Sequence, residues 1–257
     1  MIRSIYNSWS GIAACQRSVD LTAHNMANLN TPAYKRSEAA FGDMLYHELH
    51  QRRLAVSSEQ DLPVGQGVQP LARALFTGQG ALVFEERPLD LAIEGEGYFR
   101  LVTDGGEELY SRNGSLQLDA EGRLVNANGD YLDVPFTLGL GVADLTISPE
   151  GAVMLKGEDG EGVGLGQIHL YRFANPGGLV EIGGGRYRAT EVAGEPREGI
   201  PGEEGFGRIR QYYLEQSNAN IGTEMINLLT AQRALQANIR GLLTADELQA
   251  LTLQIRV

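Results

Sequence analysis

The side-chain types that most often carry catalysis occur in this chain, but their spacing completes no site. His47 and His50 are three residues apart in the run HELH, whereas the H-E-x-x-H zinc motif places its ligands at i and i+4. We therefore expect a solvated helix or loop there. His24 and His169 have no partner in the sequence and are expected to be ordinary packed or surface residues. The histidine pattern predicts no metal site.

Other catalytic patterns are equally incomplete. Gly95-Glu96-Gly97 follows a strand-like run, but Arg100 replaces the third glycine of a dinucleotide fingerprint, so the pattern predicts a turn between strands. Cys15 lies in a helical segment without a His that spacing would present to it, and no serine lies in a G-x-S-x-G elbow. Carboxylates such as Glu85-Glu86 and the run GEDGEG at 157–162 could supply an acid and a base, but so acidic a segment produces such pairs by chance. We predict no catalytic residue, no cofactor and no enzyme; the alternative is an acidic β-rich enzyme that acts on carbohydrate.

Composition narrows the class of protein further. The 257 residues are 42% hydrophobic, which is enough for a folded core, and the net charge of −12 argues against nucleic acid or an anionic membrane as a partner. Cys15 is the only cysteine, so no intrachain disulfide can form. The N-terminus lacks the apolar core of a signal peptide, and no stretch approaches the ~18 apolar residues of a membrane span. We expect neither membrane insertion nor a cleaved signal.

Glycine and charge divide the chain into helical ends and a turn-rich middle. Residues 60–207 hold 29 of the 33 glycines and 8 of the 9 prolines, and the acidic excess also lies in the middle. Each end carries an apolar stripe at steps of three and four, which is typical of a helix that packs on another helix. Asn28, Asn30 and Thr31-Pro32 are expected to end the first helix. The stripes comprise Ile2, Ile5, Trp9, Ile12, Gln16, Val19, Ala23 and Met26, and then Ile221, Met225, Leu228, Gln232, Leu235, Ile239 and Leu242.

The middle of the chain predicts short strands joined by tight turns. In residues 108–132, Asn113-Gly114 and Asn128-Gly129 are type I′ hairpin signals and Glu121-Gly122 marks a third turn, which together predict a β-meander. Further strands are predicted within Leu89–Ile93, Tyr98–Thr103, Leu145–Ser148, Ala152–Lys156, Gln167–Ala174 and Arg186–Thr190.

These elements predict an α+β fold, with a mostly antiparallel β central domain and terminal helices that pair in a coiled-coil-like manner. The predicted segments are an assembly helix at 1–30, an extended linker with an insertion at 31–80, a β-rich outer domain at 81–207 and a second assembly helix at 208–257.

Two apolar stripes at opposite ends of one chain can pair as antiparallel helices. Additional apolar residues, among them Leu229, Leu243 and Leu251, stay outside such a pair, so we expect other copies of the chain to cover them and build a tube. Gln16 and Gln232 interrupt the stripes and are candidates for residues that fix the register, or they lie at the stripe edge. A monomeric binding module is an alternative that these stripes disfavour.

Five sequence blocks in order resemble the bacterial flagellar rod and hook proteins. The N-terminal signature covers residues 27–36, the central blocks cover 76–82, 89–99 and 110–129, and the C-terminal signature lies within 214–233. Ala33 stands where this family usually has Gly, Ala219-Asn220 where Val-Asp is common, and Leu235 where an aromatic residue is common. The motif residues are Asn28, Asn30, Thr31, Pro32, Tyr34, Lys35, Ser217, Asn218, Glu224, Gln232 and Arg233.

This resemblance implies an axial subunit of the flagellar basal body in the cell envelope, exported uncleaved through the flagellar export apparatus. It also implies partners among copies of itself and other rod and hook proteins, with ring proteins around them. The length and the segment from Tyr46 to Val68 look most like the distal rod protein, and a proximal rod or hook-like protein is the alternative. The resemblance further suggests that this segment stiffens the tube by bridging neighbouring subunits.

Overall fold

The computed structural model describes residues 2–44, 67–138, 145–156 and 162–255. His47, His50, most of the predicted insertion and most of the GEDGEG run lie outside these residues. The chain forms two compact units. The helical unit comprises residues 1–27, 37–75 and 220–257, and the β unit comprises residues 28–36 and 76–219.

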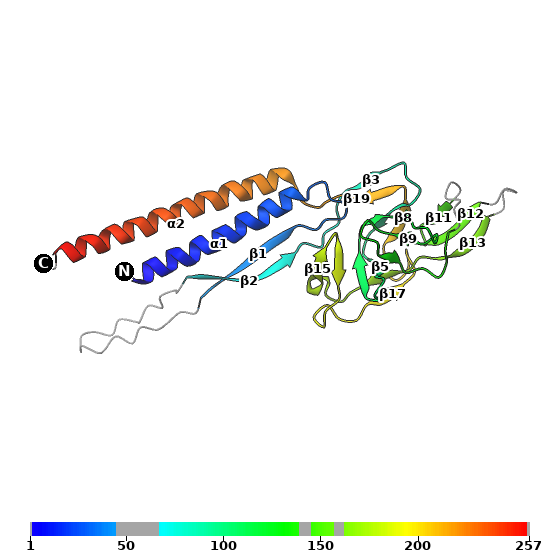
Figure 1. The fold of residues 1–257 in the computed structure, drawn as a ribbon, viewed down its shortest axis with the longest axis horizontal. Coiled ribbons are helices and arrows are strands. Elements are labelled where there is room, and N and C mark those ends of the chain that lie inside the picture. Colours follow the sequence, from blue (N-terminus) through cyan, green and yellow to red (C-terminus); the bar gives the residue numbers. More distant parts are fainter. Residues whose placement is uncertain (1, 45–66, 139–144, 157–161, 256–257) are drawn as a thin grey trace. The chain divides into compact units, whose positions relative to one another are not determined.

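The helical unit contains two long helices and a strand pair. Helix α1 (Ile2–Ala27) and helix α2 (Ile221–Ile255) lie side by side in opposite directions (Figure 1). Strand β1 (Ser37–Asp43) pairs antiparallel with β2 (Val68–Leu75), and the register shifts between Ala40 and Phe41. These paired strands occupy part of the segment predicted as an extended linker.

Local sequence sets the helix ends. Helix α1 ends at Ala27, before the Asn and Pro residues that were predicted to stop it. Helix α2 is capped by Asn220, whose side-chain oxygen accepts hydrogen bonds from the backbone N–H groups of Gly222 (2.9 Å) and Thr223 (3.3 Å). The helix begins later than position 208 because β18 (Arg208–Gln211) and β19 (Tyr213–Glu215) precede it.

The β unit is built from antiparallel strands, so the predicted α+β fold is confirmed. All six runs predicted as strands outside the meander contain a strand. The largest sheet has the order β15 (Val180–Gly183), β16 (Arg186–Arg188), β6 (Glu108–Ser111), β5 (Phe99–Val102), β10 (Tyr131–Leu132), β9 (Leu124–Val125) and β8 (Gln117–Leu118). Smaller sheets have the orders β18-β4 (Asp90–Glu94)-β7 (Gly114–Ser115), β11 (Leu145–Ile147)-β12 (Ala152–Lys156)-β13 (Gly162–Gln167), β14 (Leu170–Arg172)-β17 (Arg197–Gly199) and β19-β3 (Leu82–Phe84), and a 3₁₀ turn covers Pro176–Gly178.

The predicted meander is only partly present. Strands β8, β9 and β10 are sequential neighbours, and the turn at Gly122 (φ +76°) joins the first two as expected. The Asn128-Gly129 turn also joins two strands, but only Gly129 has positive φ, so it is not type I′. The Asn113-Gly114 prediction is wrong. Gly114 lies in β7 and pairs with β4, and a Cβ there would meet the Leu91 carbonyl oxygen at 1.9 Å, so close backbone approach requires this glycine.

The core of the β unit is apolar and continuous. Its fully buried members come from several sheets and include Leu91, Ile93, Phe99, Leu101, Leu109, Leu170 and Ile209. Beside them, Tyr98, Tyr110, Tyr171, Phe173 and Tyr187 form edge-to-face ring contacts. This core holds the strands whose ends carry the buried charges described below.

Candidate assembly surfaces and a buried polar cluster

The face of α2 that packs against α1 combines leucines with small and polar side chains. Its least exposed positions step by four and three along Glu224, Leu228, Ala231, Leu235, Asn238, Leu242 and Ala245. The Asn238 amide nitrogen lies 3.7 Å from the Cys15 sulfur, and a Cβ on Gly11 would meet the Asn238 side chain at 2.9 Å. The two helices therefore approach closely over small residues. Of the predicted α2 stripe, only Leu228, Leu235 and Leu242 lie on this face.

The predicted α1 stripe is not the face that packs on α2. Trp9 is 60% exposed and Gln16 and Ala23 are also exposed, while Ile5, Ile12, Val19 and Met26 are half-buried. The buried side chains of α1 are instead Ser10, Thr22 and Asn25. The error has a physical cause: large apolar side chains make the strongest pattern in the sequence, but close helix packing selects the small residues beside them.

Both helices consequently present apolar side chains to solvent in the single chain. Gln16 and Gln232 are exposed too, so they do not fix the register of the chain's own helix pair; a role in register between copies remains a prediction. The exposed apolar residues of α2 include the predicted Ile221, Met225 and Ile239, together with Ile226, Leu229, Leu243, Leu248 and Leu251.

A groove of about 690 Å³ lies within the helical unit between the helices and the strand pair. Small side chains of both helices line it, among them Ala14, Ser18 and Ala234, and Phe41 lines it from β1. At one end, the Asn25 amide donates to the Ser37 carbonyl oxygen (2.9 Å) and to the Glu224 carboxylate (3.3 Å), and accepts from the Ser37 N–H group. Asn25 thus ties α1, β1 and α2 together by buried hydrogen bonds.

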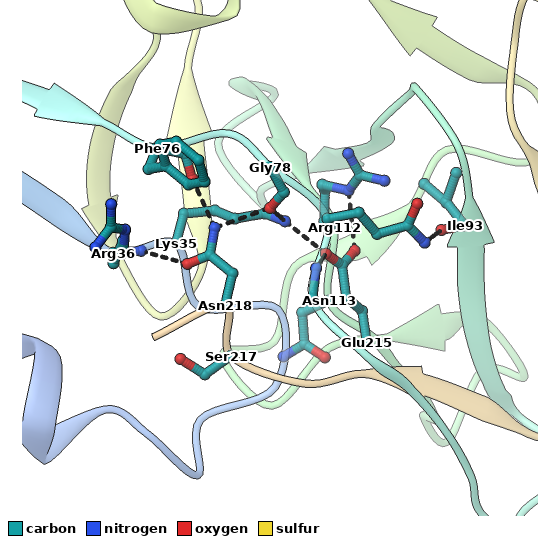
Figure 2. A network of polar contacts seen from close by, with 12 residues as sticks. Lys35, Arg36, Phe76, Gly78, Ile93, Arg112, Asn113, Glu215, Ser217 and Asn218 are labelled. Atoms are coloured by element: carbon teal, nitrogen blue, oxygen red, sulfur yellow. Dashed lines mark hydrogen bonds and ion pairs between the residues drawn. The ribbon is translucent and has the colours of Figure 1, made fainter. Parts of the chain in front are cut away.

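The β unit contains a buried cluster of charged groups centred on Glu215 (Figure 2). The Lys35 ammonium lies 2.5 Å from one Glu215 oxygen, and the Arg112 Nε donates to the other at 3.0 Å. The three residues are between 2% and 5% exposed. Lys35 also donates to the Gly78 carbonyl oxygen at 2.8 Å, and the Gly80 N–H group donates to Glu215 at 2.8 Å. Every ion here is therefore paired, as buried charges must be.

Asn218 extends this cluster through its side-chain amide. Its oxygen accepts from the Arg36 N–H group at 2.7 Å, and its nitrogen donates to the carbonyl oxygens of Phe76 (2.7 Å) and Gly78 (2.8 Å) (Figure 2). Burial lowers the pKa of the Lys35 ammonium, an effect that the Glu215 carboxylate opposes and the neighbouring Arg112 reinforces. The arrangement joins segments that are far apart in the sequence, since Lys35 and Glu215 are separated by 180 residues.

Comparison with known proteins identifies the chain's relatives. Residues 92–155 match the flagellar hook protein FlgE/F/G D1 domain, and residues 210–255 match the flagellar basal body rod FlgEFG protein C-terminal family. The flagellar basal-body rod protein FlgG of Caulobacter vibrioides is 35% identical over 262 residues, covering 99% of this chain and 100% of that protein. The chain belongs to the flagellar basal-body rod protein family.

Further relatives support the same assignment for this rod protein. The FlgG protein of Borreliella burgdorferi is 36% identical and matches 96% of each chain. The flagellar hook protein FlgE of Helicobacter mustelae is 35% identical, but the match covers 51% of this chain and 30% of that protein. The resemblance to the distal rod protein read from the motifs is confirmed, because the matches over nearly the full length are to FlgG proteins. The chain is a structural rod protein of the flagellar basal body.

Three of the rod protein's signature residues make the side-chain hydrogen bonds described above, in the charged cluster around Glu215 or with Asn25. Lys35 and Asn218 belong to the cluster of the β unit, and Glu224 accepts from Asn25 in the helical unit. Asn28 accepts a hydrogen bond from the Thr31 hydroxyl in the turn that follows α1, and Tyr34 accepts one from the Asn218 N–H group. The Ser217 hydroxyl accepts a hydrogen bond from the Ala219 N–H group at 3.2 Å. The side chains of Gln232 and Arg233 are exposed on α2.

Two members of the β cluster were missed as site residues. Arg112 and Glu215 lie within the motif blocks 110–129 and 214–233, but a charge in a strand-like run is usually exposed, so the sequence gives no direct sign of their burial. Neither residue carries a clearer local signal, because Arg112 follows β6, which already contains Glu108, and Glu215 ends the short strand β19.

The remaining chemical candidates do not converge. His169 pairs with Glu198 at 2.5 Å, with both side chains substantially exposed, and the described part of the chain contains no group of three potential metal ligands. Gly95 and Gly97 have positive φ and form the expected turn between β4 and β5. No helix among the described residues is long and apolar enough to cross a membrane.

Proposed function

We propose that this rod protein is an axial subunit of the distal rod that polymerises with copies of itself through the exposed apolar faces of α1 and α2. The observation that carries the proposal is the row of exposed apolar side chains on α2. A helix face that stayed in water would be expected to carry polar side chains instead. Family membership supplies the context of an assembly, and the groove lined by small side chains offers space for a neighbouring helix.

The rod so formed transmits torque from motor to hook and encloses part of the export channel. Its other partners are neighbouring rod and hook proteins, the export apparatus that delivers the chain, and surrounding ring proteins. We further infer that the chain is not an enzyme, and the support for this is its structural family.

The direct test is polymerisation of the purified full chain across a concentration series, followed by sedimentation and electron microscopy. Sheared polymer is added as seed so that slow nucleation does not hide growth. The variant Met225→Ser with Leu229→Ser should raise the critical concentration at least about tenfold, because each 1.4 kcal/mol of lost contact is a factor of ten. The control is Val192→Ser, which removes a more exposed apolar side chain (71%, against 51% for Met225 and 54% for Leu229) from the β unit.

An unchanged critical concentration in the α2 variant, or an equal rise in the control, would refute assembly through this face. Thermal unfolding of the α2 variant should match that of the parent chain, since exposed side chains contribute little to monomer stability.

A further inference from the structure

The two units are joined by four stretches of chain. The chain passes from one unit to the other after Ala27, Arg36, Leu75 and Ala219. A single connection allows free swivelling, whereas several connections carry a twisting load if their ends are anchored. Within the β unit, three segments end at these connections: residues 28–36, 76–81 and 215–219. Their hydrogen bonds show how the connections are anchored to this unit.

These three segments are bonded to one another along their backbones. The Ala33 N–H group donates to the Glu215 carbonyl oxygen at 2.7 Å, and the Gln216 N–H group donates to the Ala81 carbonyl oxygen at 2.8 Å. The Phe76 N–H group donates to the Arg36 carbonyl oxygen at 3.0 Å. Each segment therefore holds the other two.

The Glu215 carboxylate joins all three segments to the sheets. It accepts from Lys35 in the first segment and from the Gly80 N–H group in the second, while its own residue ends β19. It also accepts from Arg112, which directly follows β6 in the largest sheet. Gln79 adds a second tie, because its side chain donates to the Ile93 carbonyl oxygen at 2.9 Å and accepts from the Gly95 N–H group at 3.0 Å.

We propose that Lys35, Arg112, Glu215 and Asn218 form a clasp that anchors the connecting segments to the β core, so that load on the connections passes into the sheets. The mechanical role rests on the proposed function as a torque-bearing rod; the anchoring does not. Glu215 is the central group because its loss leaves two buried cations without their counterion.

Hydrogen exchange on the full chain, kept below the concentration at which it polymerises, tests the anchoring. In Glu215→Gln, the amides of Ala33, Gly80 and Asn218 should exchange on the order of a hundredfold faster, because breaking a buried ion pair is strongly destabilising. The amides of Leu101 and Leu109 in the core strands should stay within about threefold of the parent rates. The matched control is Glu94→Gln, whose ion pair with Arg210 is about half exposed and contributes little.

A milder variant keeps the test valid if Glu215→Gln fails to fold. Asn218→Ala removes the acceptor of the Arg36 N–H group and should accelerate exchange of that amide about tenfold, with the core strands unchanged. The anchoring proposal is overturned by unchanged exchange in the connecting segments, and equally by acceleration that extends uniformly through the β unit.

Distances within the β unit give an independent readout. Spin labels are placed at Asn30→Cys and Glu195→Cys, both exposed positions, in a Cys15→Ser background. The distance distribution by pulsed electron resonance should be at least about twofold wider in Glu215→Gln than in the parent or Glu94→Gln. An unchanged width refutes the clasp. Because both labels lie in one unit of the monomer, this result is independent of whether the chain polymerises.

Discussion

The two units use apolar and polar residues in opposite ways. In the β unit, large apolar side chains such as Leu101 and Ile93 are fully buried, and most of the ion pairs lie at the surface. In the helical unit, the buried side chains include Ser10, Thr22 and Asn25, while Trp9 and Leu229 remain exposed. The comparison shows that the β unit buries its large apolar side chains within one chain, whereas the helical unit leaves many of them exposed.

The largest difference in unfolding free energy should appear when a leucine is truncated to alanine in each of the two units. Leu101→Ala in the core is expected to lower the free energy of unfolding by about 2–5 kcal/mol, since it leaves a cavity among fully buried side chains. Leu229→Ala, at a position that is 54% exposed, should change it by less than about 0.5 kcal/mol. Urea unfolding of the two monomers measures both. Equal losses would mean that α2 is already covered in the single chain.

An intermediate effect concerns a buried carboxylate of the β unit that is less well paired than Glu215. Burial raises the pKa of Asp90 above its ordinary value of 3.8, although Arg87, at 3.8 Å, opposes this. Between the ordinary and the raised pKa the folded chain holds a proton that the unfolded chain has released, so stability falls as the pH rises through this window.

Asp90→Asn should remove that pH dependence. The unfolding free energy of the variant minus that of the parent should be larger at about pH 7 than at about pH 3.5. At the higher pH the parent no longer gains stability from protonation of Asp90. Urea unfolding at the two pH values gives the difference. A parent–variant difference that does not change with pH would contradict the assignment of this carboxyl.

The smallest effect is expected at Ala33, which joins the clasp with positive φ (+56°) and 1% exposure. Ala33→Gly relieves about 1–2 kcal/mol of left-handed strain but loses about 0.8 kcal/mol of methyl burial and gains chain entropy in the unfolded state. The net change in unfolding free energy should be within about 1 kcal/mol of zero. A β-branched side chain is strained much more at positive φ, so Ala33→Val should be clearly destabilising. Urea unfolding of both variants measures the two changes, and a neutral Ala33→Val would contradict the assignment of strain to this position.

Much of the secondary structure could be read from the sequence. Helix α1 ends where Asn28 and Pro32 predicted, and β12 has the predicted bounds Ala152–Lys156. These elements depend on local signals, namely capping, proline and alternation, which the sequence displays directly. The type I′ turn at Asn113-Gly114 failed because Gly114 serves a tertiary need, the close approach of β7 to β4.

The candidate sites were less predictable. Heptad spacing identified helices that pair, but it selected Trp9 and Gln16 for a face that the helix pair does not bury. The clasp could be read only in part: Lys35 and Asn218 were singled out through the family motif, while their contacts with Glu215, Arg112 and the backbone required the folded chain.

By itself the sequence determined the element types, the α+β class and the family, because propensity, periodicity and motif order are local properties of the chain. The tertiary structure alone decided which helix faces pack and which charges meet. Lys35 and Glu215 are 180 residues apart, and a pairing over that distance depends on how every intervening strand closes. Burial then makes the pairing obligatory, since a lone charge of either sign could not remain in that core.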